Sequence, residues 1–206
     1  MKWLILAAAF GALSACQPAL QRIAGTQAPQ QANLSRAEPG APVMRVQIPS
    51  RNADAELSRV ATTNGVETWL AVDNISLAFR EGVLVGSRGL GFDLMAADAT
   101  GTLTAMAGQG PPVYRRQMRY LTGDHQSTYL MAGCSMTNAG AESIGGQRLT
   151  RLEEKCTARG DVFTNIFWQN AEGAVVETRQ WVSPQIGYFR SSFANARPRP
   201  IEISLD

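Results

Sequence analysis

The chain has little of what a metal site or a hydrolytic active site requires. It contains one histidine, His125, and three cysteines, with no Cys-x-x-Cys pair among them. Zinc sites are built from several closely spaced cysteine or histidine ligands, so we expect no metal ion. No Gly-x-Ser-x-Gly segment accompanies His125, which argues against a serine-hydrolase triad. The charge-free apolar run from Trp3 to Ala12 is shorter than the ~20 residues that cross a bilayer.

That apolar run fits a cleavable secretory signal. Met1-Lys2 places one positive charge before it, and small residues follow it in Leu13-Ser14-Ala15-Cys16. These four residues resemble the lipobox of bacterial lipoproteins, in which the cysteine is lipidated and becomes the new N-terminus. We therefore predict a signal peptide over residues 1–15 and a membrane anchor on Cys16, and Gln17 rather than Asp favours the outer membrane. The alternatives are an ordinary signal peptide with a chance cysteine, or a buried first helix of a cytosolic domain.

The charge balance argues against nucleic-acid binding. The formal net charge of the whole chain is +2, and removal of the signal peptide takes away one positive charge, Lys2. A nucleic-acid-binding protein needs a strongly basic face, which a near-neutral chain does not suggest. With 45% hydrophobic and 17% charged residues, the composition is that of an ordinary globular protein.

The segment after the lipobox is predicted to be a tether. Residues 16–42 are rich in Gln, Ala and Pro and have no sustained apolar period. Such a segment cannot bury enough surface to offset its ordering entropy. As a flexible linker it would hold the following domain roughly 25–30 Å from the bilayer. A short helix over residues 19–24 is the alternative, and residues 43–206 are predicted to form a single β domain.

The two remaining cysteines, Cys134 and Cys156, are predicted to form a disulfide. Exported proteins keep disulfides, and this is the one internal pairing left once Cys16 is lipidated. A metal site and a catalytic thiol are the alternatives for these two residues.

From Val43 onward the sequence mostly has the period of two that is typical of β-strands. Ile75, Leu77 and Phe79, for example, alternate with other residues. Arg80-Glu81-Gly82 and Asn170-Ala171-Glu172-Gly173 are predicted to be tight turns between strands. We predict an all-β, antiparallel meander that forms a sandwich or a partly open barrel, with short helices at most, at Arg51–Val60 and Asp93–Ala97. The longer strands are predicted at Val113–Thr122, Ser127–Met136, Arg148–Thr157, Val162–Gln169, Val175–Val182 and Gln185–Phe193.

One glycine-rich segment, Gly86-Ser87-Arg88-Gly89-Leu90-Gly91, has part of the pattern of a phosphate-binding loop. It lacks the third glycine of the dinucleotide fingerprint, and no Lys-Ser or Lys-Thr follows. We therefore expect no cofactor, and we expect the glycines to permit a bend or bulge at a barrel corner.

This segment carries a family resemblance. Trp69, Ile75-Ser76-Leu77 and the run from Gly82 to Leu94 resemble the core motif of the YjbF/GfcB lipoproteins, which are encoded in group 4 capsule and exopolysaccharide operons. Glu177-Thr178-Arg179-Gln180-Trp181-Val182-Ser183-Pro184 resembles the second motif of that family. Ser87 stands where the family usually has Thr. The resemblance implies an outer-membrane lipoprotein of antiparallel β architecture that assists polysaccharide production or export, and it supplies no catalytic residues.

Arginine and tryptophan residues on the predicted strands are candidates for glycan or partner binding. Arginine forks suit the carboxylates and phosphates of an acidic polysaccharide, and tryptophan rings can stack on sugars. We predict a groove lined by Arg88, Arg116, Arg179 and Trp181. Asp93 is a further candidate for glycan or partner binding and the best single candidate for a catalytic carboxylate, and its alternative role is to cap a turn or a short helix. The alternative for the whole set is a solvated arginine face over a tryptophan core.

Three functions from different classes follow. The first is a non-enzymatic accessory lipoprotein of polysaccharide export that acts through protein or glycan contacts. The second is a lipid or lipoprotein carrier with an acyl chain in the mouth of a β-barrel. The third is a glycan-cleaving enzyme, which needs two converging carboxylates. The scarcity of histidine and of catalytic motifs favours the first.

Overall fold

A computed structural model describes residues 40–121 and 126–193. The predicted signal peptide, Cys16, His125 and all but the last three residues of the predicted tether lie outside these ranges. Within them, no helix is long and apolar enough to cross a membrane.

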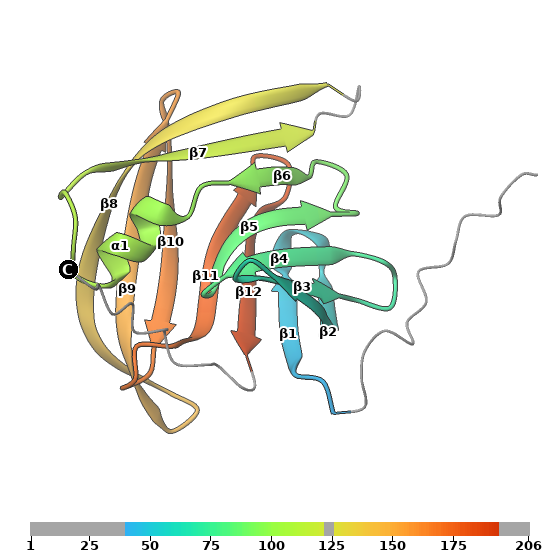
Figure 1. Ribbon diagram of the computed structural model, residues 1–206, viewed down its shortest axis with the longest axis horizontal. Coiled ribbons are helices and arrows are strands. Elements are labelled where there is room, and N and C mark those ends of the chain that lie inside the picture. The colour runs from blue at the N-terminus through green and yellow to red at the C-terminus, as the bar shows by residue number, and fades with distance from the viewer. Residues whose placement is uncertain (1–39, 122–125, 194–206) are drawn as a thin grey trace, which may run out of the picture. The chain divides into compact units, whose positions relative to one another are not determined.

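Twelve antiparallel strands form one sheet in the order β5-β4-β3-β2-β1-β12-β11-β10-β9-β8-β7-β6, which confirms the predicted all-β class (Figure 1). Every pair of consecutive strands is adjacent in the sheet except β5 and β6. The first strand, β1, also pairs with the last strand, β12. The strands are β1 Val43–Ile48, β2 Ala53–Thr63, β3 Val66–Leu70, β4 Ser76–Arg80, β5 Val83–Arg88, β6 Leu94–Ala97, β7 Tyr114–Leu121, β8 Ser127–Ile144, β9 Gln147–Ala158, β10 Asp161–Gln169, β11 Val175–Ser183 and β12 Gly187–Phe193.

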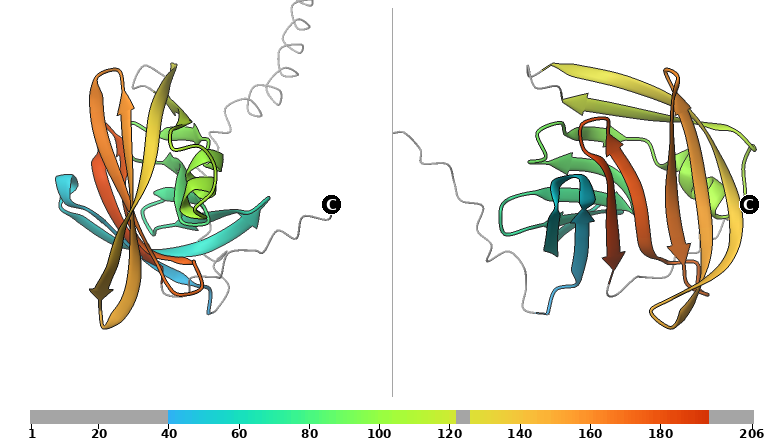
Figure 2. Two further views of the ribbon diagram at one scale, coloured as in Figure 1. Left: turned by 90° about the vertical axis from the view of Figure 1, so that its left-hand side faces the viewer. Right: turned by 180° about the vertical axis from the view of Figure 1, so that it is seen from behind.

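The sheet curls until its two edge strands, β5 and β6, lie side by side. The Arg88 guanidinium at the end of β5 donates to the backbone carbonyl of Leu94 on β6, at 3.1 Å. Gly86 of β5 lies at the same junction, where a Cβ built on it would be in ordinary contact with the same carbonyl oxygen, at 3.6 Å. Figure 2, left, separates the green strands and the orange strands into two facing layers. The result is a nearly closed barrel.

Alternation along the strands decides which side chains enter the barrel. On β7, Tyr114, Arg116, Met118 and Tyr120 are buried, and the residues between them are exposed. The period of two over the predicted strand Val113–Thr122 thus puts Arg116 on the buried side with Tyr114, Met118 and Tyr120. The apolar interior is dominated by rings and aliphatic chains from opposite walls, including the fully buried Phe79, Phe167 and Phe189.

Both predicted turns are confirmed. Glu81 and Gly82 have φ values of 47° and 82°, as a two-residue hairpin turn between β4 and β5 requires. In the turn between β10 and β11, the Asn170 side chain accepts a hydrogen bond from the backbone N–H of Ala174. Gly82 has a second constraint, because a Cβ there would lie 2.6 Å from the Cβ of Val175.

Both predicted helices are wrong. Residues 53–63 form β2, because their backbone groups pair with β1 on one side and with β3 on the other. These two sets of hydrogen bonds outweigh the local helix propensity of the segment. Leu94–Ala97 forms β6 by pairing with β7. The actual helices are a three-residue 3₁₀ turn, η2 (Pro49–Arg51), and α1 (Thr100–Met106).

Helix α1 has weak helix formers, and packing on the barrel stabilises it. Its Thr102 and Met106 are buried. Gly101 lies against the Tyr114 ring, where a Cβ would lie 2.6 Å from the nearest ring atom. The helix therefore packs against β7, and Thr102 places a hydroxyl in the interior.

Candidate functional site

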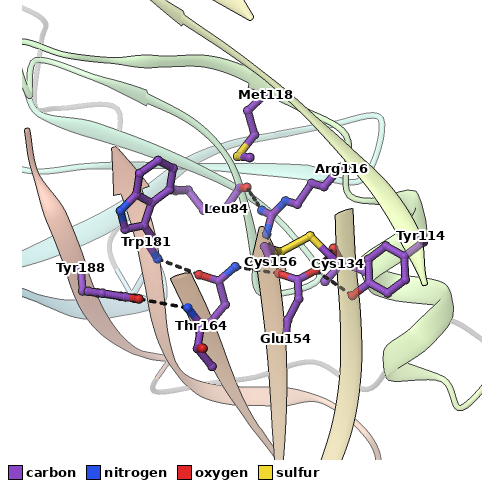
Figure 3. Close-up of a disulfide and its surroundings, with 12 residues drawn as sticks. Leu84, Tyr114, Arg116, Met118, Cys134, Glu154, Cys156, Thr164, Trp181 and Tyr188 are labelled. Carbon is purple, nitrogen blue, oxygen red and sulfur yellow. Dashed lines mark hydrogen bonds and ion pairs between the residues drawn. A yellow bond between two sulfur atoms is a disulfide. The ribbon is translucent and has the colours of Figure 1, made fainter. Parts of the chain in front are cut away.

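A buried carboxylate, Glu154 on β9, is the centre of a polar network inside the barrel (Figure 3). Its Oε1 accepts hydrogen bonds from the Thr102 hydroxyl at 2.5 Å and from the Tyr114 hydroxyl at 2.8 Å. Its Oε2 accepts from the Arg116 guanidinium at 2.8 Å and from the Asn165 amide at 2.6 Å. Four donors from α1, β7 and β10 thus bind two oxygens, and the network ties three separate elements to β9.

The network holds Glu154 ionised. Burial by itself raises the pKa of Glu154, but the positive charge of Arg116 and the hydrogen bonds from Thr102, Asn165 and Tyr114 outweigh it, and the net result is a pKa below the ordinary value. The pKa of the Tyr114 hydroxyl is raised, first by burial and then by the nearby Glu154 charge. Tyr114 therefore stays a neutral donor, and Arg116 and Glu154 form a buried ion pair.

The predicted disulfide lies beside this network. Cys134 and Cys156 are directly opposite on β8 and β9, with 4.1 Å between their Cα atoms. Their sulfur atoms lie near the Glu154 carboxylate, in an arrangement that free thiolates could use to hold a metal. Metal binding and nucleophilic catalysis both need a thiolate. With the two sulfur atoms bonded to each other, neither alternative applies to these cysteines.

The two family motifs meet across the barrel interior. Gln180 of the second motif accepts from the backbone N–H of Leu84 at 2.9 Å and donates to the carbonyl of Gly82 at 2.8 Å, both in the first motif. Arg116 donates to the carbonyl of Leu84 at 3.0 Å. These are backbone groups of an edge strand, which has no neighbour on one side. Gln180 from β11 and Arg116 from β7 thus supply hydrogen bonds that a paired strand would otherwise make.

Asp93 serves the turn that joins β5 to β6. Its carboxylate accepts from the Ser87 hydroxyl at 2.9 Å, from the Gly89 N–H at 3.0 Å and from the Leu90 N–H at 3.1 Å. Ser87 Oγ in turn accepts from the N–H of Leu94. Asp93 thus has the turn-capping role that was its alternative in the sequence. Ser87 stands where the YjbF/GfcB motif usually has Thr, and this difference is small because Ser and Thr both supply the hydroxyl.

The structure does not bring the predicted groove residues together. Arg116 is 4% exposed and bonded inside the barrel, and Arg88 lies at the junction of β5 and β6. Arg179 and Trp181 are close to each other on β11, and both are partly exposed. A groove lined by all four residues therefore does not form.

Arg179 and Trp181 lie where β10 and β11 separate. Backbone pairing of the two strands covers β11 from Val175 to Arg179 and stops there. Beyond it, the Trp181 N–H donates to the Asn165 side chain, and the Thr164 N–H donates to the Tyr188 hydroxyl (Figure 3). The Arg179 guanidinium lies 3.6 Å from the centre of the Tyr188 ring. These contacts fill the opening between the strands.

The other two tryptophans of the described residues, Trp69 and Trp168, have structural contacts. Trp69 is buried in the main core. Trp168 packs with Leu149 and Ile166 in a small separate cluster, and its indole N–H donates to Glu142 at 2.9 Å.

Sequence reasoning missed the role of Glu154, and it did not single out Gln180 or Asn165. A signal was present. Glu154 stands between Leu152 and Cys156 at the inward parity of β9. A charged residue at such a position needs a partner, and Arg116 has the same inward parity on β7.

These features define a nearly closed, twelve-stranded antiparallel β-barrel whose central charges neutralise each other. The chain belongs to the family described as group 4 capsule polysaccharide lipoprotein gfcB, YjbF, whose model matches residues 18–192, so the family resemblance is confirmed. Its fold is similar to the crystal structure of the hypothetical lipoprotein YmcC from Escherichia coli K12, with a TM-score of 0.67 and 18% sequence identity. The similarity covers 84% of this chain and 92% of that chain, and at this identity it concerns the fold alone. A comparison with curated proteins gives no match.

Proposed function

We propose that this protein is a non-enzymatic accessory factor in the production or export of capsule or exopolysaccharide, held by lipid on Cys16 at the periplasmic face of the outer membrane. The observation that carries the proposal is the family match, which covers residues 18–192 and names a capsule polysaccharide lipoprotein. Partners of the proposed factor are the membrane, through the lipid, and polysaccharide or proteins of the export machinery.

The state of the buried carboxylates supports a non-enzymatic role. Glycoside cleavage needs one carboxyl group to act as an acid and another as a base or nucleophile. Glu154 is bonded to four donors, and Asp93 is bonded to three. Each would have to give up structural hydrogen bonds before it could exchange a proton with a substrate.

The N-terminal sequence supports the anchor. Leu13-Ser14-Ala15-Cys16 has the small residues and the cysteine of a lipobox, and Gln17 is not the Asp associated with retention at the inner membrane. Two or more acyl chains give stable attachment to a bilayer, whereas one chain gives marginal binding. The domain is then confined near the membrane that an exported polymer crosses.

A clean deletion tests the proposal. We expect the deletion to lower surface and secreted polysaccharide, wild-type protein to restore it, and Cys16→Ala to fail at equal protein abundance measured by immunoblot. Cell fractionation should place the wild type in the outer membrane and Cys16→Ala in the soluble periplasm. Unchanged polymer in the deletion would reject the function, and full rescue by Cys16→Ala would reject the need for the anchor.

A further inference from the structure

The outward side chains of β7 to β10 form a face with an uncommon composition. It combines four cations with three exposed apolar side chains. We call it the basic face, and it consists of Arg115, Arg119, Tyr129, Met131, Lys155, Val162 and, in the turn between β9 and β10, Arg159, all exposed.

The strand register places these residues on one continuous surface. Arg119 on β7 is directly opposite Tyr129 on β8, and Arg115 is opposite Gly133 on β8. Neighbouring strands are about 4.8 Å apart, and four residues along a strand span about 13 Å. Arg115 and Arg119 therefore stand about 13 Å apart on the same side of β7, a spacing that suits an extended polymer.

The cations of this face have no acidic partners among residues 40–121 and 126–193, where ion pairs are formed by Arg45, Arg59, Arg116 and Arg151 instead. Glu153 shares the outward parity of β9, and Arg151 pairs with it at 2.7 Å. Asp161 is opposite the buried Ala158, so alternation directs it to the other side of the sheet. The basic face thus carries four cations that form no ion pair with the described residues, and Asp98, whose N–H donates to the carbonyl of Gln117, is the acidic residue that borders it on the β6 side.

One apolar member of the basic face, Tyr129, has its backbone bonded to a cation of the same face. Tyr129 is 53% exposed, and the Arg159 guanidinium donates to its backbone carbonyl at 3.0 Å. Gly133 leaves the surface beside Arg115 flat, because no other atom lies within 4 Å of a Cβ built there. A flat surface with an exposed tyrosine ring and separated guanidinium groups matches a ligand that has both apolar ring faces and carboxylates.

We propose that the basic face binds an acidic polysaccharide, with the arginines on uronate carboxylates and the Tyr129 ring against a sugar ring. The choice of a glycan rests on the proposed function. A membrane surface is the less suitable occupant, because the apolar residues here stand singly on strands and do not form the continuous apolar side that peripheral membrane segments insert.

Purified full-length protein in neutral detergent micelles, with polygalacturonate as the acidic probe and dextran as the neutral one, tests the proposal. We expect binding to polygalacturonate alone, and weaker binding at higher salt because the charges are exposed. Arg115→Gln with Arg119→Gln should weaken binding about tenfold, the combined effect of two exposed charge pairs. Tyr129→Ala should weaken binding at unchanged salt dependence, since it removes no charge.

The matched control is Arg148→Gln with Arg190→Gln, which removes the same charge from exposed positions outside the basic face. It should change binding by less than twofold, and both double variants should keep the wild-type urea midpoint. Equal losses in the two double variants would show a net-charge effect and overturn the proposal. Failure to bind polygalacturonate, or binding to vesicles containing phosphatidylglycerol in its place, would also overturn it. These results are independent of the deletion strain, whose polymer yield tests the proposed function alone.

Discussion

Replacement of Glu154 by Gln should strongly destabilise the barrel. The amide keeps the shape of the side chain but loses the negative charge, which leaves the Arg116 guanidinium in the interior without its counter-ion at 2.8 Å. Glu154 is fully buried, and the side chain of Arg116 is 5% exposed, so water cannot replace the lost partner. Removal of one member of a buried ion pair costs about 3–5 kcal/mol. That is a large part of the 5–15 kcal/mol by which a typical domain is stable.

The assay is a urea titration of the purified protein followed by circular dichroism. For a domain of roughly 150–250 residues, each kcal/mol lost from the free energy of unfolding also lowers the melting temperature by about 2–4 °C. Arg116→Met should also destabilise, but the double variant should cost about 1–3 kcal/mol less than the sum of the single changes, because it leaves no unpaired charge. The neighbouring surface change Glu153→Gln is the control and should cost less than about 1 kcal/mol. Additive effects of Glu154→Gln and Arg116→Met would refute the ion-pair argument.

The same network predicts the response to acid. The pKa of Glu154 in the folded protein lies below its ordinary value of 4.5. Its contribution to stability is therefore complete above about pH 4.5 and is lost as the pH falls through the folded pKa. The free energy of unfolding of the wild type should decrease in this acidic range. The difference between the wild type and Glu154→Gln should shrink there, and a constant difference from pH 7 to pH 3 would contradict the assignment.

Three further changes test other parts of the structure. Replacement of both Cys134 and Cys156 by Ala should lower the free energy of unfolding by about 3 kcal/mol, given their separation of 22 residues, and a reductant should have no further effect on that variant. Gln180→Leu should leave buried backbone groups at the edge of β5 without hydrogen-bond partners, which lowers the free energy of unfolding by about 1–3 kcal/mol for each group. Hydrogen exchange of the Leu84 amide should become faster, and an unchanged exchange rate would mean that the amide has another partner. Gly82→Ala should destabilise by more than 1 kcal/mol in a thermal melt, because φ is +82° and the space is occupied, and a neutral result would argue against this turn geometry.

Much of the fold follows from local pattern. The alternation on β7 predicts correctly that Arg116 shares a side with Tyr114 and Met118. The prediction of a helix at Arg51–Val60 was wrong for two reasons. Leu57 is the one fully buried side chain of β2, so this segment shows little alternation of buried and exposed residues. The pairing with β1 and β3 that stabilises the strand cannot be read from the sequence of the segment itself. The pairing of β1 with β12 in the middle of the sheet likewise joins distant segments of the chain.

The site was harder to predict than the fold. The disulfide follows from the small number of cysteines, and the capping role of Asp93 follows from its place in a turn. The partnership of Arg116 and Glu154 does not, because β7 and β9 are separated in the sheet by β8, and the contact passes over β8 on the inner side of the sheet. Parity alone places both residues inside, and the register of three strands and the curl of the sheet decide that they meet.

The position of β12 has a consequence for how the protein is made. The last described strand lies in the middle of the sheet, between β1 and β11, and Met44 pairs with Phe193. A chain that emerges from its N-terminus first therefore presents β1 with one side unpaired until almost all of the chain has appeared. Pairings between such distant segments form late and slowly, and an unpaired strand can associate with other chains in the meantime. Truncation before β12 would remove the middle of the sheet and leave the barrel in two halves.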